Sequence, residues 1–125
     1  VAVPVLANGD IWSVADWKRC REISGVQSVM IGRGLVRQPD LARQIKAHQR
    51  AEVYQPLTWQ GMWPLIQEFW QRVRQRVTPR HAPGRLKQWL AMLLHCYPEA
   101  GQMFKQIRRE TDALVIDALL AKPFD

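Results

Sequence analysis

Two glycine-containing stretches, Ala7-Asn8-Gly9-Asp10 and Met30-Ile31-Gly32-Arg33-Gly34, decide the fold that this sequence predicts. Each follows an apolar run, residues 1–6 and 26–31, that is typical of a buried parallel strand, and each leads into a helical pattern. The order strand, helix, strand predicts a βαβ unit with two parallel strands and a right-handed crossover. Two strands cannot bury a parallel sheet, so the unit is expected to need strands from elsewhere.

The second stretch also predicts an anion site at the turn between strand and helix. Glycine lets the backbone approach a phosphate closely, and the start of a helix adds partial positive charge. Arg33 adds a fork of N–H donors that suits a phosphate group. The alternative is a turn without a ligand, because many strand–helix turns contain glycine and Asn8-Gly9 is itself a turn signal.

Predicted helix caps and interruptions of the helical pattern divide the first half of the chain into separate elements. Ser13 and Asp16 have the spacing of a capping box, and Ser24-Gly25 predicts the end of that helix. After Gly34 we expect a short turn, and then a helix with Asp40 as its N-cap. The pattern lapses over residues 49–57, which predicts a boundary between a part at residues 1–50 and a part at residues 56–125.

The second part is predicted to be a small bundle of four helices. Thr58 is the expected N-cap of the first helix, which Pro64 should kink or delay to Trp63. Residues 78–84 are predicted to be a loop, Pro98 to begin a helix, and Thr111 to cap the last one, which carries Leu114, Val115, Leu119 and Leu120. Four tryptophans of this part offer base-stacking surfaces, although helical spacing favours packing in the core: Trp59, Trp63, Trp70 and Trp89.

The charge of the chain favours a polyanionic partner. The net charge is +7 at pH 7 and the isoelectric point is about 10.1, and such a surface attracts nucleic acid. Half of the 18 basic residues fall between Glu68 and Glu110. They are Arg72, Arg74, Arg76, Arg80, Arg85, Lys87, Lys105, Arg108 and Arg109. A basic domain that is merely soluble is the alternative.

Composition argues against other classes of protein. No apolar run approaches the roughly 18 residues that suggest a membrane span, and no cysteine or histidine pair has the spacing of metal ligands. Cys20 and Cys96 lie far apart in helical patterns, which suits reduced thiols and a cytoplasmic location.

Three motifs resemble one family. The stretches PVLANGDI at residues 4–11 and VMIGRG at residues 29–34 resemble the last two barrel strands of the tRNA-dihydrouridine synthases. The stretch GRLKQWL at residues 84–90 resembles the helical domain of that family's C subgroup. The motifs occur in the family's order, and the resemblance covers about residues 1–109. It implies the last two βα units of a TIM barrel followed by a helical tRNA-binding domain, the C-terminal part of a larger enzyme.

The resemblance implies a flavin-dependent reduction of a D-loop uridine of tRNA to dihydrouridine, with NADPH recharging the flavin. The residues that match the family's flavin mononucleotide (FMN) contacts are Asn8, Gly9, Asp10, Gly32 and Arg33. Those that match its contacts to the tRNA backbone are Arg85, Lys87 and Arg108. One departure concerns Met92, which stands where the C subgroup can carry a tyrosine.

The family's proton donor, a cysteine on an earlier barrel loop, has no match in this sequence. Cys20 falls in the crossover helix and Cys96 in the helical part, so the chain alone is expected to be inactive. Its unpaired strand edges are expected to cause self-association. Two alternatives remain open: a non-catalytic, basic helical module that binds nucleic acid or a protein, and an FMN barrel reductase that acts on small molecules.

Overall fold

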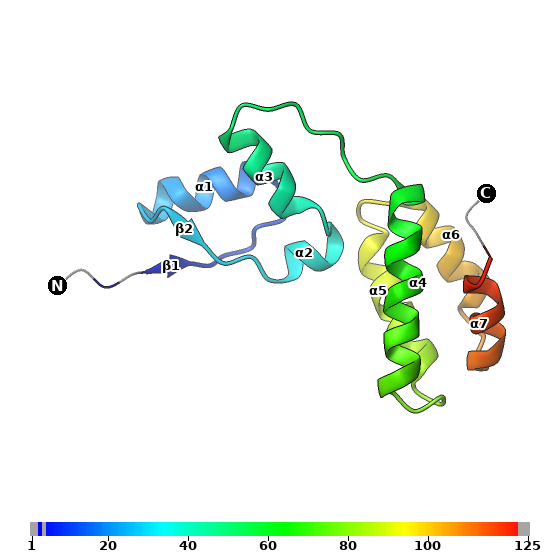
Figure 1. The fold of residues 1–125 in the computed structure, drawn as a ribbon. Coiled ribbons are helices and arrows are strands. Elements are labelled where there is room, and N and C mark those ends of the chain that lie inside the picture. The colour runs from blue at the N-terminus through cyan, green and yellow to red at the C-terminus, as the bar shows by residue number, and fades with distance from the viewer. Residues whose placement is uncertain (1–2, 4, 123–125) are drawn as a thin grey trace. The chain divides into compact units, whose positions relative to one another are not determined.

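The structure is a computed structural model that describes residue 3 and residues 5–122. The chain divides into two compact units, residues 1–56 and 57–125 (Figure 1). The first unit contains β1 (Leu6–Ala7), α1 (Val14–Ser24), β2 (Ser28–Val29), α2 (Arg33–Arg37) and α3 (Leu41–Gln49). The second contains α4 (Trp59–Arg76), α5 (Ala82–Leu93), α6 (Pro98–Ile107) and α7 (Ala113–Leu120).

The two strands of the first unit pair in parallel, as predicted. Leu6 lies opposite Ser28 and Ala7 opposite Val29, and the crossover helix α1 contacts both strands (Figure 1). The strands are shorter than the apolar runs that predicted them, and residues 1, 2 and 4 of the first run lie outside the described residues. The prediction that this run is buried is wrong for Val5 and Leu6, which are both mostly exposed. The described sheet has two strands, which leave these side chains largely uncovered.

The predicted caps of α1 are confirmed. The Ser13 hydroxyl accepts a hydrogen bond from the Asp16 N–H at 3.1 Å, and the Asp16 carboxylate accepts one from the Trp12 N–H at 3.0 Å. Gly25 ends the helix in the left-handed conformation with φ 68°, which glycine adopts without strain. These local hydrogen bonds fix both ends of the crossover. The core of the unit beneath it consists of Ile11, Trp17, Leu41 and Ile45.

One prediction for the first unit is wrong and another is confirmed only in part. The expected turn after Gly34 is the short helix α2, which already begins at Arg33. Asp40 is the N-cap residue of α3, as predicted, but its side chain makes no capping hydrogen bond. The carboxylate is buried and accepts a hydrogen bond from the Tyr54 hydroxyl at 3.0 Å instead. This long-range contact replaces the local cap. Burial, helped by the hydrogen bond with Asp40, raises the pKa of Tyr54.

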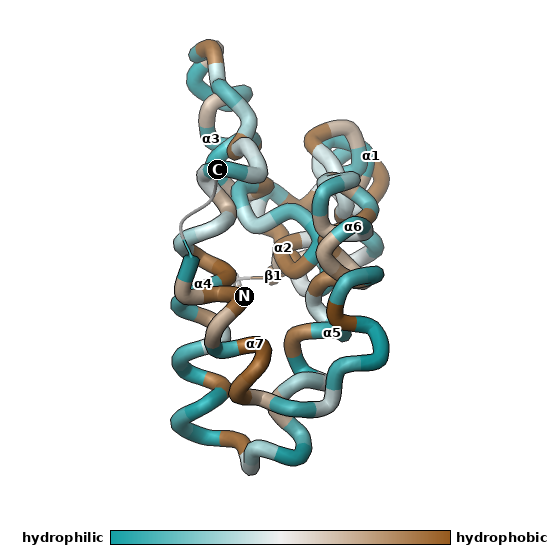
Figure 2. Tube along the Cα trace, turned by 90° about the vertical axis from the view of Figure 1, so that its right-hand side faces the viewer, coloured by the Kyte–Doolittle hydropathy of each residue, from teal (hydrophilic) through white to brown (hydrophobic). Residues whose placement is uncertain are grey.

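The four helices of the second unit share one hydrophobic core. Helix α5 contacts each of the other three, and its largest fully buried residues are Leu86, Leu90 and Leu93. Apolar and polar residues alternate along α4, whereas α7 is apolar over most of its length (Figure 2). Trp59 and Trp70 are buried, as the core interpretation of the tryptophans predicted.

The start of α4 is also as predicted, because the Thr58 hydroxyl accepts a hydrogen bond from the Gly61 N–H at 3.1 Å. A start delayed to Trp63 is wrong, since α4 runs from Trp59 through Pro64 to Arg76. The predicted loop over residues 78–84 is too long, because α5 begins at Ala82 with Pro83 in its first turn. Proline is tolerated there because first-turn N–H groups have no intrahelical partner.

The predicted cap of α7 is wrong, and its predicted apolar residues are only partly confirmed, because Leu120 is buried and Leu119 packs against the core. The N-cap is Asp112 rather than Thr111, and its carboxylate accepts a hydrogen bond from the Leu114 N–H at 2.9 Å. Leu114 is 68% exposed, and the inward face consists of Ala113, Ile116 and Leu120. Periodicity cannot select a face on a helix that is apolar almost all round. Within the described residues, no helix is both long and apolar enough to cross a bilayer.

Candidate functional site

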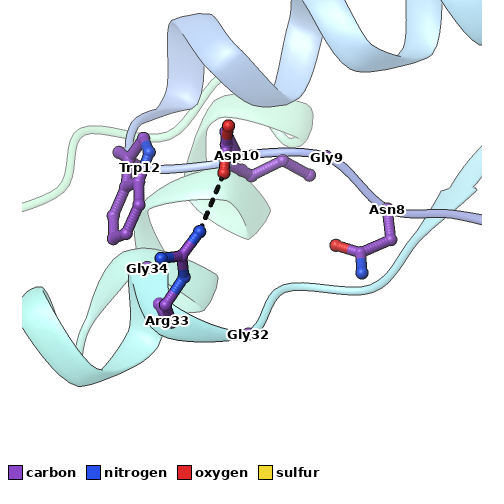
Figure 3. Close-up of a pocket in the computed structure, with 8 residues that line it drawn as sticks. Asn8, Gly9, Asp10, Trp12, Gly32, Arg33 and Gly34 are labelled. Atoms are coloured by element: carbon purple, nitrogen blue, oxygen red, sulfur yellow. Dashed lines mark hydrogen bonds and ion pairs between the residues drawn. The ribbon is translucent and has the colours of Figure 1, made fainter.

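A pocket of about 340 Å³ lies where the two parallel strands end (Figure 3). Its lining comes from the loop after β1, from Gly32 after β2 and from the first residues of α2: Asn8, Gly9, Asp10, Ile11, Trp12, Gly32, Arg33 and Gly34. The carboxyl ends of parallel strands meet at one edge of a sheet, and ligands of α/β proteins bind at that edge. All five residues predicted as cofactor contacts therefore line one pocket.

The glycines of the pocket have two different roles. A Cβ atom at Gly9 or at Gly32 would meet nothing within 4 Å, so the backbone at both positions faces open space. At Gly34 a Cβ would collide with the main-chain carbonyl oxygen of Ile11. Gly34 thus lets the start of α2 pack directly against the loop after β1, while Gly9 and Gly32 leave the backbone accessible.

Arg33 and Asp10 face each other across the pocket. The guanidinium of Arg33 lies 3.2 Å from the carboxylate of Asp10, and the two side chains are 73% and 79% exposed (Figure 3). An ion pair this exposed contributes little to stability. The arginine can therefore exchange the carboxylate for another anion at small energetic cost, and Asn8 lies at the other end of the pocket from this pair (Figure 3).

Two residues at this site, Trp12 and Arg37, were not predicted from the sequence. The guanidinium carbon of Arg37 lies 4.0 Å from the centre of the Trp12 ring, and that of Arg33 lies 5.3 Å from it. One feature of the sequence could have indicated Trp12: it lies two residues after Asp10, in a loop already assigned to the site. The predicted contribution of a helix start is small, because α2 has only 5 residues and so few aligned peptide dipoles.

The three residues predicted to contact tRNA all lie in the second unit, in different environments. Arg85 on α5 and Arg108 at the end of α6 are exposed. Lys87 is half-buried, and its ammonium group donates a hydrogen bond to the main-chain carbonyl of Glu110 at 2.7 Å. Arg85 and Arg108 thus present their charges to solvent, whereas Lys87 also links α5 to the segment that follows α6.

Two further cations of the basic region form ion pairs. Arg72 pairs with Glu68 one turn earlier on α4, at 2.8 Å. Arg74 binds both carboxylate oxygens of Asp117 on α7, at 2.9 and 3.1 Å. The hydrogen bonds from Arg74, supported by one from the Trp70 indole, lower the pKa of Asp117 against the opposing effect of burial. Both arginines are therefore already paired with carboxylates of the second unit.

Other reactive groups form no cluster in the described part of the chain. No group of three or more histidine, cysteine, aspartate or glutamate side chains could hold a metal ion there. Cys20 is half-buried on α1 and Cys96 is exposed after α5, and they do not form a disulfide.

Comparison with known proteins finds one family. Residues 1–115 match the family described as dihydrouridine synthase (Dus). The chain is 55% identical over 121 residues to the tRNA-dihydrouridine(16) synthase of Aquipseudomonas alcaligenes, a match that covers 97% of this chain and 38% of that protein. It is 53% identical over 120 residues to the protein of the same name from Pseudomonas putida, with 96% and 37% covered. For that of Pseudomonas syringae pv. tomato the identity is 56%, with 96% and 38% covered. The chain thus spans less than two fifths of the length of these relatives.

Proposed function

The chain belongs to the dihydrouridine synthase family, and from that premise we propose that it is one segment of a tRNA-dihydrouridine synthase. The proposed activity is the reduction of a uridine in the D-loop of tRNA, and the names of the relatives favour position 16. We further propose that the segment is C-terminal in the enzyme, contributing the last two βα units of a barrel and a helical tRNA-docking domain. The observation that carries the proposal is the single pocket formed by both strand-end motifs.

The pocket suits the phosphate end of FMN. Open space at Gly9 and Gly32 leaves main-chain groups accessible to a ligand, and the exposed Arg33 guanidinium supplies charged donors. These features fit the group, so Arg33 and the backbone near Gly32 would hold the phosphate. The chemistry that the bound flavin supplies is hydride transfer, with NADPH as the source of electrons.

Asn8 and Asp10 would orient the ribityl chain of the cofactor. An amide and a carboxylate both accept hydrogen bonds from hydroxyl groups, and both side chains are exposed at the pocket. Asp10 would lose its ion pair when Arg33 turns to a phosphate, and hydrogen bonds from ribityl hydroxyls offset that loss. Such exchange is inexpensive because the pair is open to solvent.

Titration with FMN and with riboflavin, which lacks the phosphate, tests this site in the full-length protein. We expect Arg33→Ala to weaken FMN binding about tenfold or more, the size of a charge-assisted hydrogen bond, and to leave riboflavin binding unchanged. Arg43→Ala is the matched control, because Arg43 is exposed on α3 of the same unit but does not line the pocket. Equal affinities for FMN and riboflavin in the unaltered protein would rule out the phosphate site.

We propose that the second unit docks tRNA through Arg85 and Arg108, with Lys87 adding charge. Phosphate contacts of this kind weaken as salt rises and orient the RNA without reading its sequence. Alanine at Arg85 or Arg108 should lower tRNA affinity and reduce the salt dependence, whereas alanine at Arg72, already paired with Glu68, should have less effect. Binding of tRNA without any binding of FMN would favour the non-catalytic nucleic-acid-binding module instead.

We also propose that the 125-residue chain alone is inactive, because neither of its cysteines lies at the pocket. The other half of the reaction, protonation of the uracil ring, then depends on residues outside this chain. Dihydrouridine formed from tRNA, FMN and NADPH by the isolated chain would contradict this proposal.

A further inference from the structure

We infer that Trp12 is a positioning residue for Arg33: the face of its indole ring holds the guanidinium at the mouth of the pocket, ready for a phosphate. The inference rests on the proposed FMN phosphate site and adds a residue to which neither the family motifs nor the sequence pattern assigns a role. Three features support it: the loop that carries Trp12 is anchored, two arginines contact the same ring, and Arg33 is exposed.

The loop that carries Trp12 is anchored on both sides. The Trp12 N–H donates a hydrogen bond to the Asp16 carboxylate at 3.0 Å, so the first turn of α1 fixes the backbone. The preceding residue, Ile11, is buried in the core, and its carbonyl packs against Gly34. The ring of Trp12 is itself half-buried. A side chain held in this way presents its face at a constant place.

Two arginines of α2 contact the Trp12 ring. Arg33 and Arg37 are four residues apart and therefore lie on the same side of the helix. Arg37 is the closer, at 4.0 Å from the ring centre, and is half-buried. Its charge repels Arg33, which lies 5.3 Å from the same ring centre. The electron-rich ring attracts both guanidinium groups and offsets this repulsion.

Arg33 needs such a constraint more than Arg37 does. Its side chain is 73% exposed and makes one weak ion pair, with Asp10. A long exposed side chain loses rotamer freedom when it binds a ligand, and this loss reduces affinity. Contact with the Trp12 ring restricts the guanidinium before the ligand arrives. Trp12 should therefore contribute to phosphate affinity through Arg33 rather than by contact with the phosphate.

The test compares FMN with riboflavin in the full-length protein and two variants. Trp12→Leu keeps apolar bulk but removes the aromatic face, and Trp12→Phe keeps a face. We expect Trp12→Leu to weaken FMN binding about threefold, the size of an exposed cation–π interaction, and to leave riboflavin binding unchanged. Trp12→Phe should restore most of the FMN affinity. Trp63→Leu is the matched control, since Trp63 is also half-buried but lies in the other unit.

A double-mutant cycle separates positioning from general structural support. In an Arg33→Ala background, Trp12→Leu should cause no further loss of FMN affinity, because the ring acts through the arginine. An equal loss in that background, a parallel loss of riboflavin binding, or unchanged FMN affinity would each overturn the inference while leaving the phosphate site intact. If the unaltered protein does not prefer FMN to riboflavin, the proposed phosphate site fails, and the role of Trp12 fails with it.

Discussion

At the scale of single residues, Gly34 is the position that best shows why the pocket has its shape. The main-chain carbonyl of Ile11 occupies the space that a Cβ would need, and Gly34 itself is buried. Because the neighbour is backbone rather than a flexible side chain, it cannot simply turn away. The close packing of the loop after β1 on the start of α2 depends on this missing side chain.

We therefore expect Gly34→Ala to destabilise the protein by about 1–3 kcal/mol, as overpacking does, and to weaken FMN binding. Thermal unfolding and FMN titration measure the two effects. Gly32→Ala is the control for stability alone, because a Cβ at Gly32 meets open space. A Gly34→Ala protein as stable as the Gly32→Ala protein would show that the two loops are not packed as described.

Asp117 gives a prediction about pH. Its pKa is lowered from the ordinary value of 3.8, chiefly by the hydrogen bonds from Arg74. A carboxylate with a lowered pKa in the folded state stabilises the fold above about pH 4, and this stability is lost as the pH falls through the folded-state pKa. The side chain is 37% exposed, so we expect no more than about 1 kcal/mol.

The measurement is the free energy of unfolding of the unaltered protein and of Asp117→Asn, between pH 7 and pH 2.5. The two should differ at neutral pH and converge at the acidic end. A difference that stays constant over this range would mean that the charge of Asp117 does not stabilise the second unit.

At the scale of helices and strands, Pro64 is the clearest departure from local preference. It lies inside α4 and is exposed, so its ring fills no part of the core. Proline has no N–H group, and the hydrogen bond that an ordinary residue would donate one turn back is missing. We expect Pro64→Ala to stabilise the protein by about 1–3 kcal/mol.

Pro98→Ala is the matched control, because Pro98 begins α6. A residue in the first turn has no intrahelical acceptor for its N–H, so this substitution should bring no comparable gain. Chemical denaturation of both variants gives the comparison. Equal effects would mean that the position of a proline within these helices does not matter to stability.

The caps explain how much of the fold the sequence could predict. Ser13, Gly25 and Thr58 act through hydrogen bonds to residues close in the chain, so their spacing alone identified them. Asp40 was correctly placed at the N-cap of α3, but its side-chain partner, Tyr54, lies 14 residues away, and a long-range contact leaves no local pattern. The buried face of α7 was only partly predicted because an almost wholly apolar helix has no distinct stripe.

The candidate site also contains features that the sequence could predict and a contact that it could not. Asn8, Gly9, Asp10, Gly32 and Arg33 could be grouped because the ends of parallel strands meet, and the structure does place them around one pocket. Whether they bind FMN stays a prediction. The contact between Trp12 and Arg37 could not be foreseen, because it requires α2 to be a helix where a turn was expected.

At the scale of the whole chain, the first unit exposes apolar surface that a folded protein normally covers. Val5, Leu6 and Met30 flank the short sheet and are all exposed. We expect the isolated 125-residue chain to self-associate, with sedimentation that depends on concentration. Leu6→Lys should reduce this dependence, whereas Val53→Lys, an equally apolar-to-charged change at an exposed site after α3, should not. A monomeric profile at all concentrations would contradict the expectation.

The hydrogen bond of Lys87 has a consequence for the speed with which an RNA would arrive. Its partner is a main-chain carbonyl, which carries no net charge, so the positive charge of the ammonium group is not cancelled. A fixed charge of this kind adds to the electrostatic field that draws a polyanion from a distance, an effect that reaches about 8 Å at physiological salt. On the proposed tRNA-docking role, Lys87 would chiefly raise the association rate of tRNA at low salt, and the exposed Arg85 and Arg108 would govern how long the complex lasts.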